Sequence, residues 1–188
     1  MKILVLLSGG IDSAALVGRA LSQGHECAAL FVDYGQPSYM AEGAAAQAVA
    51  DHFGVRLYNT YTKVRLGDMA TGTDAHVVPA RNLLLASLAV NVALVEGYTD
   101  VWLGAISEDY LHYEDCRLGF AMQLSKATVM LGISVHFPWV FEQANKQHVV
   151  GLARAYGVPL EVTYSCYAKA PACGACPSCK ERERVLAK

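Results

Sequence analysis

The sequence contains little charge and no surplus of positive charge. Of its 188 residues, 17% are Asp, Glu, Lys or Arg, and the formal net charge at pH 7 is −2. Without a basic surplus there is no electrostatic reason to expect tight binding of DNA or RNA. Apolar residues make up 54% of the chain, which excludes a disordered protein, and the length suits one domain with a full core.

The sequence also lacks the features of a secreted or membrane-bound protein. No apolar run is long enough to cross a bilayer, and the first residues indicate a strand rather than a signal peptide. We therefore predict a cytoplasmic protein without membrane contacts. In that compartment its six cysteines are better interpreted as thiols or metal ligands than as disulfides.

The first thirteen residues, MKILVLLSGGIDS, carry the most informative pattern. An apolar strand at 3–7, buried on both faces, is followed by a glycine turn and a helical run. Two adjacent glycines let the backbone approach a ligand and arrange N–H groups around it, and the helix start adds partial positive charge. An anion is therefore expected here, although a plain turn in which Asp12 caps the helix is the simpler alternative.

Known phosphate loops differ from this turn. The G-K-[ST] ending of a Walker A loop is missing, and so is the G-x-G-x-x-G spacing of a dinucleotide fold.

Strand and helix patterns alternate along the chain. After the first pair, we predict strands at 26–35, 55–60, 100–105 and 134–137, and helices at 38–53, 81–96, 119–130 and 143–156. The helix at 81–96 is apolar nearly throughout, which predicts that it is well buried. This order predicts an α/β fold with a doubly wound parallel sheet, a Rossmann-like α/β domain over 1–160.

The same order predicts where ligands bind. In such sheets they bind beyond the carboxyl ends of the strands, so residues 8–13 and 33–36 should face one crevice. The polar segment 63–77 is predicted to be a short mobile loop, and 161–188 a small cysteine-bearing appendage on the α/β domain.

Four of the six cysteines crowd together near the end of the chain: Cys166, Cys173, Cys176 and Cys179. The last three form C-x-x-C-x-x-C, a spacing that lets neighbouring thiolates bind one ion. A tetrahedral site of four thiolates is typical of structural zinc, and it leaves no open position for chemistry. A redox pair and an iron–sulfur cluster are the alternatives.

Taken in order, the motifs resemble those of known enzymes. S-G-G-x-D-S at 8–13 is similar to the pyrophosphate loop of N-type ATP pyrophosphatases, which cleave ATP between its α- and β-phosphates. Over nearly the full length the chain resembles the 7-cyano-7-deazaguanine synthase family of queuosine biosynthesis. The matching segments are SGGIDS (8–13), DYGQ (33–36), VPARN (78–82), GAISEDYLHYEDCR (104–117), KQHVV (146–150), and TYSCY with CGACPSC (163–179).

The resemblance implies an ATP-dependent carbon–nitrogen ligase. The carboxylate of 7-carboxy-7-deazaguanine would be activated as an acyl adenylate with release of pyrophosphate, and ammonia would convert it to the 7-amide. A second adenylation, on the amide oxygen, would end in loss of AMP and formation of the nitrile. The resemblance further implies magnesium with the ATP, structural zinc, free ammonia and a homodimer.

The candidate residues at the nucleotide end surround the glycine turn. We expect Ser8, Asp12, Ser13, Arg81 and Lys146 to be catalytic, with Asp12 as a cap or a magnesium partner rather than a phosphate contact. A guanidinium such as that of Arg81 binds phosphate or carboxylate with two hydrogen bonds, although a surface salt bridge is the alternative. Lys146 would more often be an exposed residue in the middle of a helix. The expected nucleotide-binding residues are Leu7, Ser8, Gly9, Gly10, Ile11, Asp12, Ser13, Asp33, Tyr34, Gln36, Arg81 and Asn82.

The candidate residues at the substrate end lie mainly in segment 104–117. Its carboxylates could recognise the N–H groups of a guanine-like edge, and Arg117 could hold the substrate carboxylate. A solvated charged loop is the alternative. The expected substrate-binding residues are Gly104, Glu108, Asp109, Asp115, Arg117 and Tyr164.

Several positions depart from the family pattern. Pro37-Ser38 replaces the usual Arg-His, Leu111-His112 replaces Ser-Gly, Ala80 stands where glycine is common, and segment 61–77 is short. The phosphate loop and the four cysteines are intact. Three alternatives therefore stay open: an enzyme that stops at the 7-amide or uses another amine, another adenylating enzyme such as a tRNA thiolase, and an inactive nucleotide-binding module.

Overall fold

The computed structural model describes residues 1–63, 78–111, 113–168 and 170–187. The predicted loop at 63–77 lies, apart from Lys63, outside the described residues. None of the described helices is both long and apolar enough to cross a membrane.

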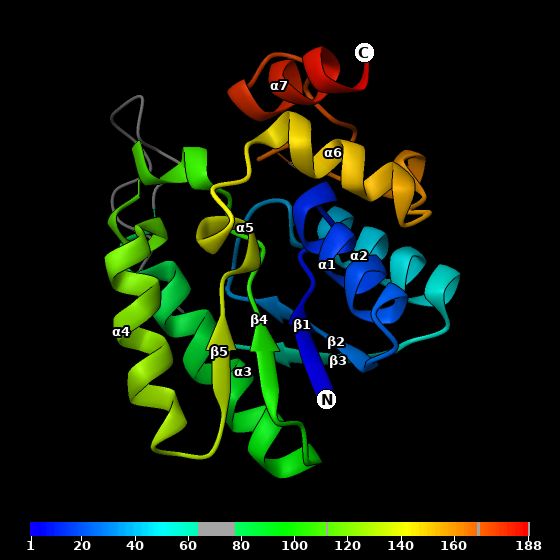
Figure 1. Ribbon diagram of the computed structural model, residues 1–188. Coiled ribbons are helices and arrows are strands. Elements are labelled where there is room, and N and C mark those ends of the chain that lie inside the picture. The colour runs from blue at the N-terminus through cyan, green and yellow to red at the C-terminus, as the bar shows by residue number, and fades with distance from the viewer. Residues whose placement is uncertain (64–77, 112, 169, 188) are drawn as a thin grey trace.

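A parallel sheet of five strands forms the centre of the molecule, in the order β3-β2-β1-β4-β5 (Figure 1). The strands are β1 (Lys2–Leu6), β2 (Glu26–Asp33), β3 (Arg56–Tyr61), β4 (Asp100–Trp102) and β5 (Ser134–His136). The chain runs outward from β1 to β3 and then crosses to β4 on the other side of β1. The predicted doubly wound parallel sheet is confirmed, and its topological switch point lies between β1 and β4.

Helices cover both faces of the sheet (Figure 1). Helices α1 (Ile11–Ser22), α2 (Tyr39–Phe53) and α6 (Lys146–Ala155) pack on one face, and α3 (Arg81–Glu96) and α4 (Leu118–Val129) pack on the other. Side chains of β1 alternate between the two layers, with Ile3 and Val5 in one core and Leu4 in the other. All three are fully buried, which explains why this strand is a continuous apolar run.

Helix α3 has the predicted bounds but not the predicted burial. Only one stripe of the helix packs on the sheet, through residues such as Ala86, Ala89 and Ala93. Leu94 and Val95 are 50% and 75% exposed. The prediction of a well-buried helix is wrong because a helix on the outside of a sheet can bury only one side, whatever its composition.

The helix predicted at 143–156 begins later in the structure. Gln143 has a positive φ of 53°, and α6 starts at Lys146 with Asn145 as its N-cap. The Asn145 side chain accepts the backbone N–H of His148, a standard start signal for a helix. The preceding turn is a separate short helix, α5 (Pro138–Phe141), which buries Trp139. Strand β4 is also shorter than predicted, ending at Trp102.

The C-terminal segment ends in α7 (Pro177–Leu186), which lies beside α6 in Figure 1. Val185 is fully buried and belongs to the same core cluster as α1 and α6. Arg182 donates hydrogen bonds to the carbonyl of Leu160 and to the hydroxyl of Thr163. Packing and hydrogen bonds therefore attach this segment to the rest of the chain.

Candidate active site

The glycine turn after β1 is shaped by its neighbours. Gly9 has a φ of +79°, and a Cβ at this position would lie 2.5 Å from the carbonyl oxygen of Glu42 in α2. The carbonyl of Gly9 accepts the N–H of Tyr164 at 2.9 Å. Only glycine fits a backbone held this closely between two other segments.

The two serines of the turn hold it closed on itself. The hydroxyls of Ser8 and Ser13 lie 3.1 Å apart, and Ser13 also donates to the carbonyl of Gly10. Gly10 is the N-cap of α1, and the cap makes no side-chain hydrogen bond. The alternative in which Asp12 caps this helix is therefore wrong.

Asp12 instead pairs with Lys146. The ammonium Nζ lies 2.5 Å from Oδ2 of Asp12, and the two side chains are 11% and 24% exposed. Burial lowers the pKa of Lys146, but the adjacent Asp12 carboxylate outweighs burial and the net shift is upward. The other carboxylate oxygen, Oδ1, is buried without a hydrogen-bond partner among the described residues. Lys146 is the first residue of α6, so the expectation of an exposed residue in mid-helix is wrong.

A cavity of about 260 Å³ opens at the carboxyl ends of the central strands. It lies where β1 and β4 diverge, the usual ligand position in this fold. The structure brings fourteen of the candidate residues to its wall: Leu7, Ser8, Gly10, Ile11, Asp12, Ser13, Tyr34, Gln36, Arg81, Asn82, Gly104, Asp109, Lys146 and Tyr164. Apolar side chains from β2 and α3, including Phe31, Val32 and Leu85, line another part.

Five candidates do not line this cavity, and three of them accept backbone N–H groups instead. Asp33 accepts the N–H of Gly35 within its own turn. Glu108 accepts the N–H of Lys146 at the start of α6, and Asp115 accepts the N–H of Asn82 near the start of α3, at 2.9 and 2.7 Å. Arg117 is exposed beside Glu114, and Gly9 is buried within the turn.

Arg81 stands at the start of α3. Its guanidinium forms a side-chain hydrogen bond with Tyr34 and lies 5.7 Å from the centre of the Tyr113 ring. Burial lowers its pKa, but the neighbouring tyrosines outweigh burial and keep the group charged. None of the ion pairs between described residues includes Arg81. Among these residues, therefore, Arg81 does not form the surface salt bridge that was the alternative. A cation placed this way at a cavity is suited to bind an anion.

Asp109 is the one carboxylate of segment 104–117 that faces the cavity. Burial is the main reason that its pKa rises to about 6, and the charge of Asp12 adds to the rise. The N–H of Ile106, which donates to Oδ2 at 3.0 Å, opposes it. A carboxyl group in this range can both give and accept a proton near neutral pH.

Sequence reasoning missed part of the wall. Glu42, Cys116, Ser165, Tyr167 and Ser178 also line the cavity. Glu42 lies on a helix whose sequence carries no signal of a site, and Cys116 is buried as an acceptor for the Asn82 amide. Ser165, Tyr167 and Ser178 lie within or beside the segments TYSCY and CGACPSC, so the family motif was a usable signal for them.

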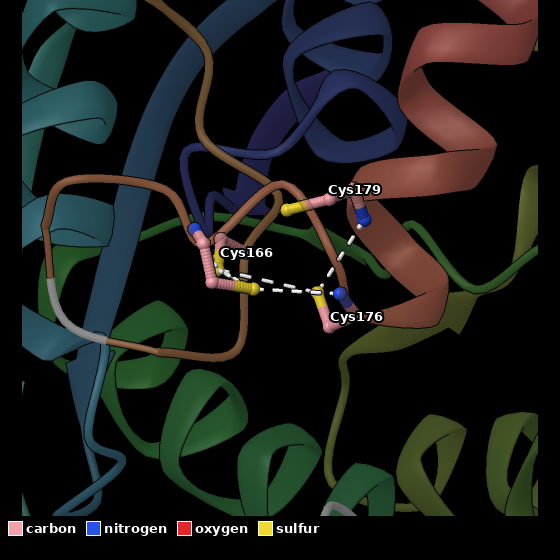
Figure 2. A group of neighbouring side chains, drawn as sticks. Cys166, Cys176 and Cys179 are labelled. Carbon is pink, nitrogen blue, oxygen red and sulfur yellow. Dashed lines mark hydrogen bonds between the residues drawn. The ribbon is translucent and has the colours of Figure 1, made fainter.

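The four C-terminal cysteines converge on one point. Their sulfur atoms all lie within 4.8 Å of one another, with Cys166 3.5 Å from Cys173 and 4.0 Å from Cys176. Figure 2 shows the sulfurs of Cys166, Cys176 and Cys179 turned toward each other. Thiolates on one tetrahedral zinc stand about 3.8 Å apart, given Zn–S bonds of about 2.3 Å. The arrangement therefore fits a single ion better than a larger iron–sulfur cluster.

The surroundings of Cys166 and Cys176 favour thiolates, whereas burial and the neighbouring sulfurs raise the pKa of Cys179 to about 12. Burial raises the pKa of Cys166, but the N–H groups of Cys173 and Ala168 that donate to its sulfur outweigh burial and lower the pKa to about 6. N–H donors also lower the pKa of Cys176 against the effect of burial. Metal binding requires the deprotonated form, so these contacts suit a metal centre.

Comparison with known proteins gives consistent results. The family model described as queuosine biosynthesis protein QueC matches residues 2–73 and 63–188. Proteins named 7-cyano-7-deazaguanine synthase are similar over nearly their full length. The one from Synechococcus elongatus is 32% identical over 98% of this chain and 90% of its own. Those from Legionella pneumophila and Frankia casuarinae are 34% and 36% identical, over 97% and 96% of this chain and 91% and 87% of theirs.

Solved structures share the fold at lower identity. The U34-tRNA thiolase NcsA of Methanococcus maripaludis, solved with its 4Fe–4S cluster, has a TM-score of 0.59 and 19% identity over 98% of this chain and 63% of its own. A predicted tRNA methyltransferase subunit from Methanocaldococcus jannaschii has a TM-score of 0.56 and 15% identity over 82% of this chain and 74% of its own. At such identities the likeness concerns the fold alone.

Proposed function

The chain belongs to the QueC family of queuosine biosynthesis, and from this premise we propose that it converts 7-carboxy-7-deazaguanine, ATP and ammonia into 7-cyano-7-deazaguanine. One observation supports this most strongly. The glycine turn, the Asp12–Lys146 pair and the half-buried Arg81 all line a single cavity at the switch point of the sheet. That cavity joins an anion-binding turn to two cations, as cleavage of ATP to AMP and pyrophosphate requires.

The glycine turn and Lys146 would hold the phosphates. The N–H groups at the start of α1 and the hydroxyls of Ser8 and Ser13 are donors, and the ammonium of Lys146 supplies charge. Magnesium bound with the nucleotide would neutralise phosphate charge, and the unpartnered Oδ1 of Asp12 is an oxygen ligand of the kind that it prefers. The apolar wall at Phe31, Val32 and Leu85 suits the adenine ring.

The reaction sequence follows from the poor reactivity of a carboxylate. Attack of the substrate carboxylate on the α-phosphate releases pyrophosphate and leaves an acyl adenylate with a good leaving group. Ammonia then displaces AMP, and Asp109 lies at the cavity with a pKa suited to accept the proton that nitrogen loses. A second ATP then adenylates the amide oxygen and releases pyrophosphate, and loss of AMP together with the two protons of the amide nitrogen yields the nitrile. Arg81 and Lys146 would stabilise the negative charge that develops in each adenylation.

The four cysteines suit a zinc ion with a structural role. Zinc with four thiolates has no position for substrate, so its contribution would be to stabilise the fold around residues 166–179. The close approach of the four sulfur atoms supports one ion.

A second copy of the chain would cover the outer surface of α3 and α4. The exposed apolar side chains of these helices include Leu94, Val95, Leu118 and Met122, with Met130 just beyond α4 and 88% exposed. Large exposed apolar surfaces of this kind commonly mark protein interfaces. Sedimentation analysis of Leu94→Glu against wild type tests this homodimer, since a charge there should shift the protein to monomer.

Mass spectrometry of products tests the proposed activity. The purified protein is incubated with 7-carboxy-7-deazaguanine, ATP, magnesium and ammonium. We expect the nitrile, with two AMP formed for each nitrile. Amide alone would show that the altered positions 37–38 and 111–112 end the reaction halfway, and absence of any product would reject the proposal. Ser8→Ala and Asp12→Ala should abolish pyrophosphate release while the protein stays folded.

A further inference from the structure

The four-cysteine segment supplies part of the cavity wall. Tyr164, Ser165, Tyr167 and Ser178 all line the cavity, and each lies within two residues of a cysteine of the cluster. The N–H of Tyr164 donates to the carbonyl of Gly9, which ties the segment to the glycine turn. The metal centre and the active site therefore share one stretch of chain.

Tyr167 extends from this stretch toward the cavity. Its backbone N–H donates to the sulfur of Cys176, so its main chain is held by the cluster. Its half-buried side chain interacts electrostatically with Tyr113, Arg81 and Asp109. With its backbone held at the cluster and its residue at the cavity wall, Tyr167 offers an aromatic ring to a ligand bound there.

The two planar ligands of the proposed reaction need different surroundings. Adenine carries no charge and suits the apolar wall of Phe31, Val32 and Leu85. The carboxylated heterocycle needs a cation for its carboxylate and a flat surface for its rings. Arg81, which has no ion-pair partner among the described residues, supplies the cation beside Tyr167.

We propose that Tyr167 is a substrate-binding residue whose ring packs against the flat heterocycle of the carboxylated substrate, while Arg81 binds its carboxylate. This rests on the proposed function and names the subsite that function requires. The predicted substrate-binding carboxylates Glu108 and Asp115 accept backbone N–H groups instead. The proposed subsite lies between the four-cysteine segment and the start of α3. Stacking on an aromatic ring holds such a heterocycle strongly, and the guanidinium of Arg81 adds selectivity for its carboxylate.

Equilibrium binding separates the two ligands. Calorimetry with 7-carboxy-7-deazaguanine and, separately, with a non-hydrolysable ATP analogue is applied to wild type, Tyr167→Phe, Tyr167→Leu and the control Tyr61→Ala. Tyr61 is 60% exposed at the end of β3 and lies outside the cavity wall. Zinc content is measured on every protein.

We expect Tyr167→Leu to weaken binding of the carboxylated heterocycle roughly 10-fold to 100-fold, with the affinity for the ATP analogue nearly unchanged. Tyr167→Phe should retain most of the affinity because it keeps the ring, and Tyr61→Ala should bind as wild type. Unchanged heterocycle affinity in Tyr167→Leu, or an equal loss for the ATP analogue, would overturn the inference. Failure of wild type itself to bind the heterocycle would instead reject the proposed function.

Discussion

The ammonium group of Lys146 lies 2.5 Å from the carboxylate of Asp12, although 134 positions separate the two residues in the chain. The contact joins the first turn of α6 to the first turn of α1, immediately beside the glycine turn. A phosphate bound at that turn would therefore meet a positive charge supplied by a helix from the far end of the sequence. The proposed phosphate site is therefore assembled by tertiary contact and not by the loop alone.

Replacement of Lys146 tests the pair. Lys146→Met should lower the free energy of unfolding by roughly 3 kcal/mol, because it leaves the Asp12 carboxylate buried without its partner. The double variant Asp12→Asn, Lys146→Met should recover most of that loss, while both variants lose pyrophosphate release. Urea unfolding in a double-mutant cycle measures the coupling. Strictly additive effects of the two substitutions would contradict the pairing.

The close fit around Gly9 predicts a large effect from one methyl group. A left-handed conformation alone costs an alanine up to about 2 kcal/mol. Gly9→Ala should lower the free energy of unfolding by more than that, because the new Cβ would also lie 2.5 Å from the carbonyl oxygen of Glu42. Gly24→Ala is a matched control: its φ is similar, at +74°, but nothing lies within 4 Å. Thermal unfolding of the two variants separates the clash from the backbone cost. Equal losses would show that the turn is not confined by α2.

The backbone conformation of Ala80 predicts that glycine at this position would stabilise the protein. This residue adopts a left-handed conformation, with φ of 53°, at the N-cap of α3. Ala80→Gly should raise the free energy of unfolding by up to about 1 kcal/mol, since glycine adopts this conformation without steric cost. Ala86→Gly, inside the same helix and buried, should instead lower it by about 1 kcal/mol or more. A loss of stability in Ala80→Gly would be the contrary outcome.

The raised pKa of Asp109 predicts a pH dependence with a definite sign. The folded protein binds this proton more tightly than the unfolded chain, so the contribution of Asp109 to stability is complete below pH 3.8 and is lost as pH rises through about 6. The rise from 3.8 to about 6 corresponds to roughly 3 kcal/mol.

Asp109→Asn removes that titration. Relative to wild type, the free energy of unfolding of the variant should increase as pH rises from about 4 to about 7. The cysteines titrate in both proteins, so their contribution cancels when the two free energies are subtracted. Urea unfolding at the two pH values measures it. A constant difference in unfolding free energy would show that the carboxyl of Asp109 is not perturbed.

Loss of one cluster cysteine predicts loss of metal and of stability together. Cys176→Ser should lower the zinc content and the unfolding temperature, because binding of a structural metal is coupled to folding. Cys27→Ser is the control, since Cys27 lies outside the cluster. Metal analysis and visible absorbance distinguish zinc from an iron–sulfur cluster. A normal metal load in Cys176→Ser would contradict the four-thiolate site.

Some errors of sequence-based prediction have identifiable causes. The helix at 81–96 was placed correctly because its apolar run and the Gly97 stop are local signals, but its burial depends on where the sheet lies. The start of α6 was missed because Gln143 has a positive φ that sequence does not reveal, although Asn145 was a usable cap signal. The four charged candidates in segment 108–117 were equivalent as sequence, yet only Asp109 faces the cavity.

Two features of this protein followed from residues 8–13 and 166–179 without any structure. The conformational freedom of Gly9 and Gly10 and the close spacing of Cys173, Cys176 and Cys179 are properties of short segments, so they survive in any fold that contains them. The contact of Lys146 with Asp12 and the position of Tyr167 at the cavity are of another kind. They depend on how distant elements pack on the sheet, and packing is a property of the whole chain.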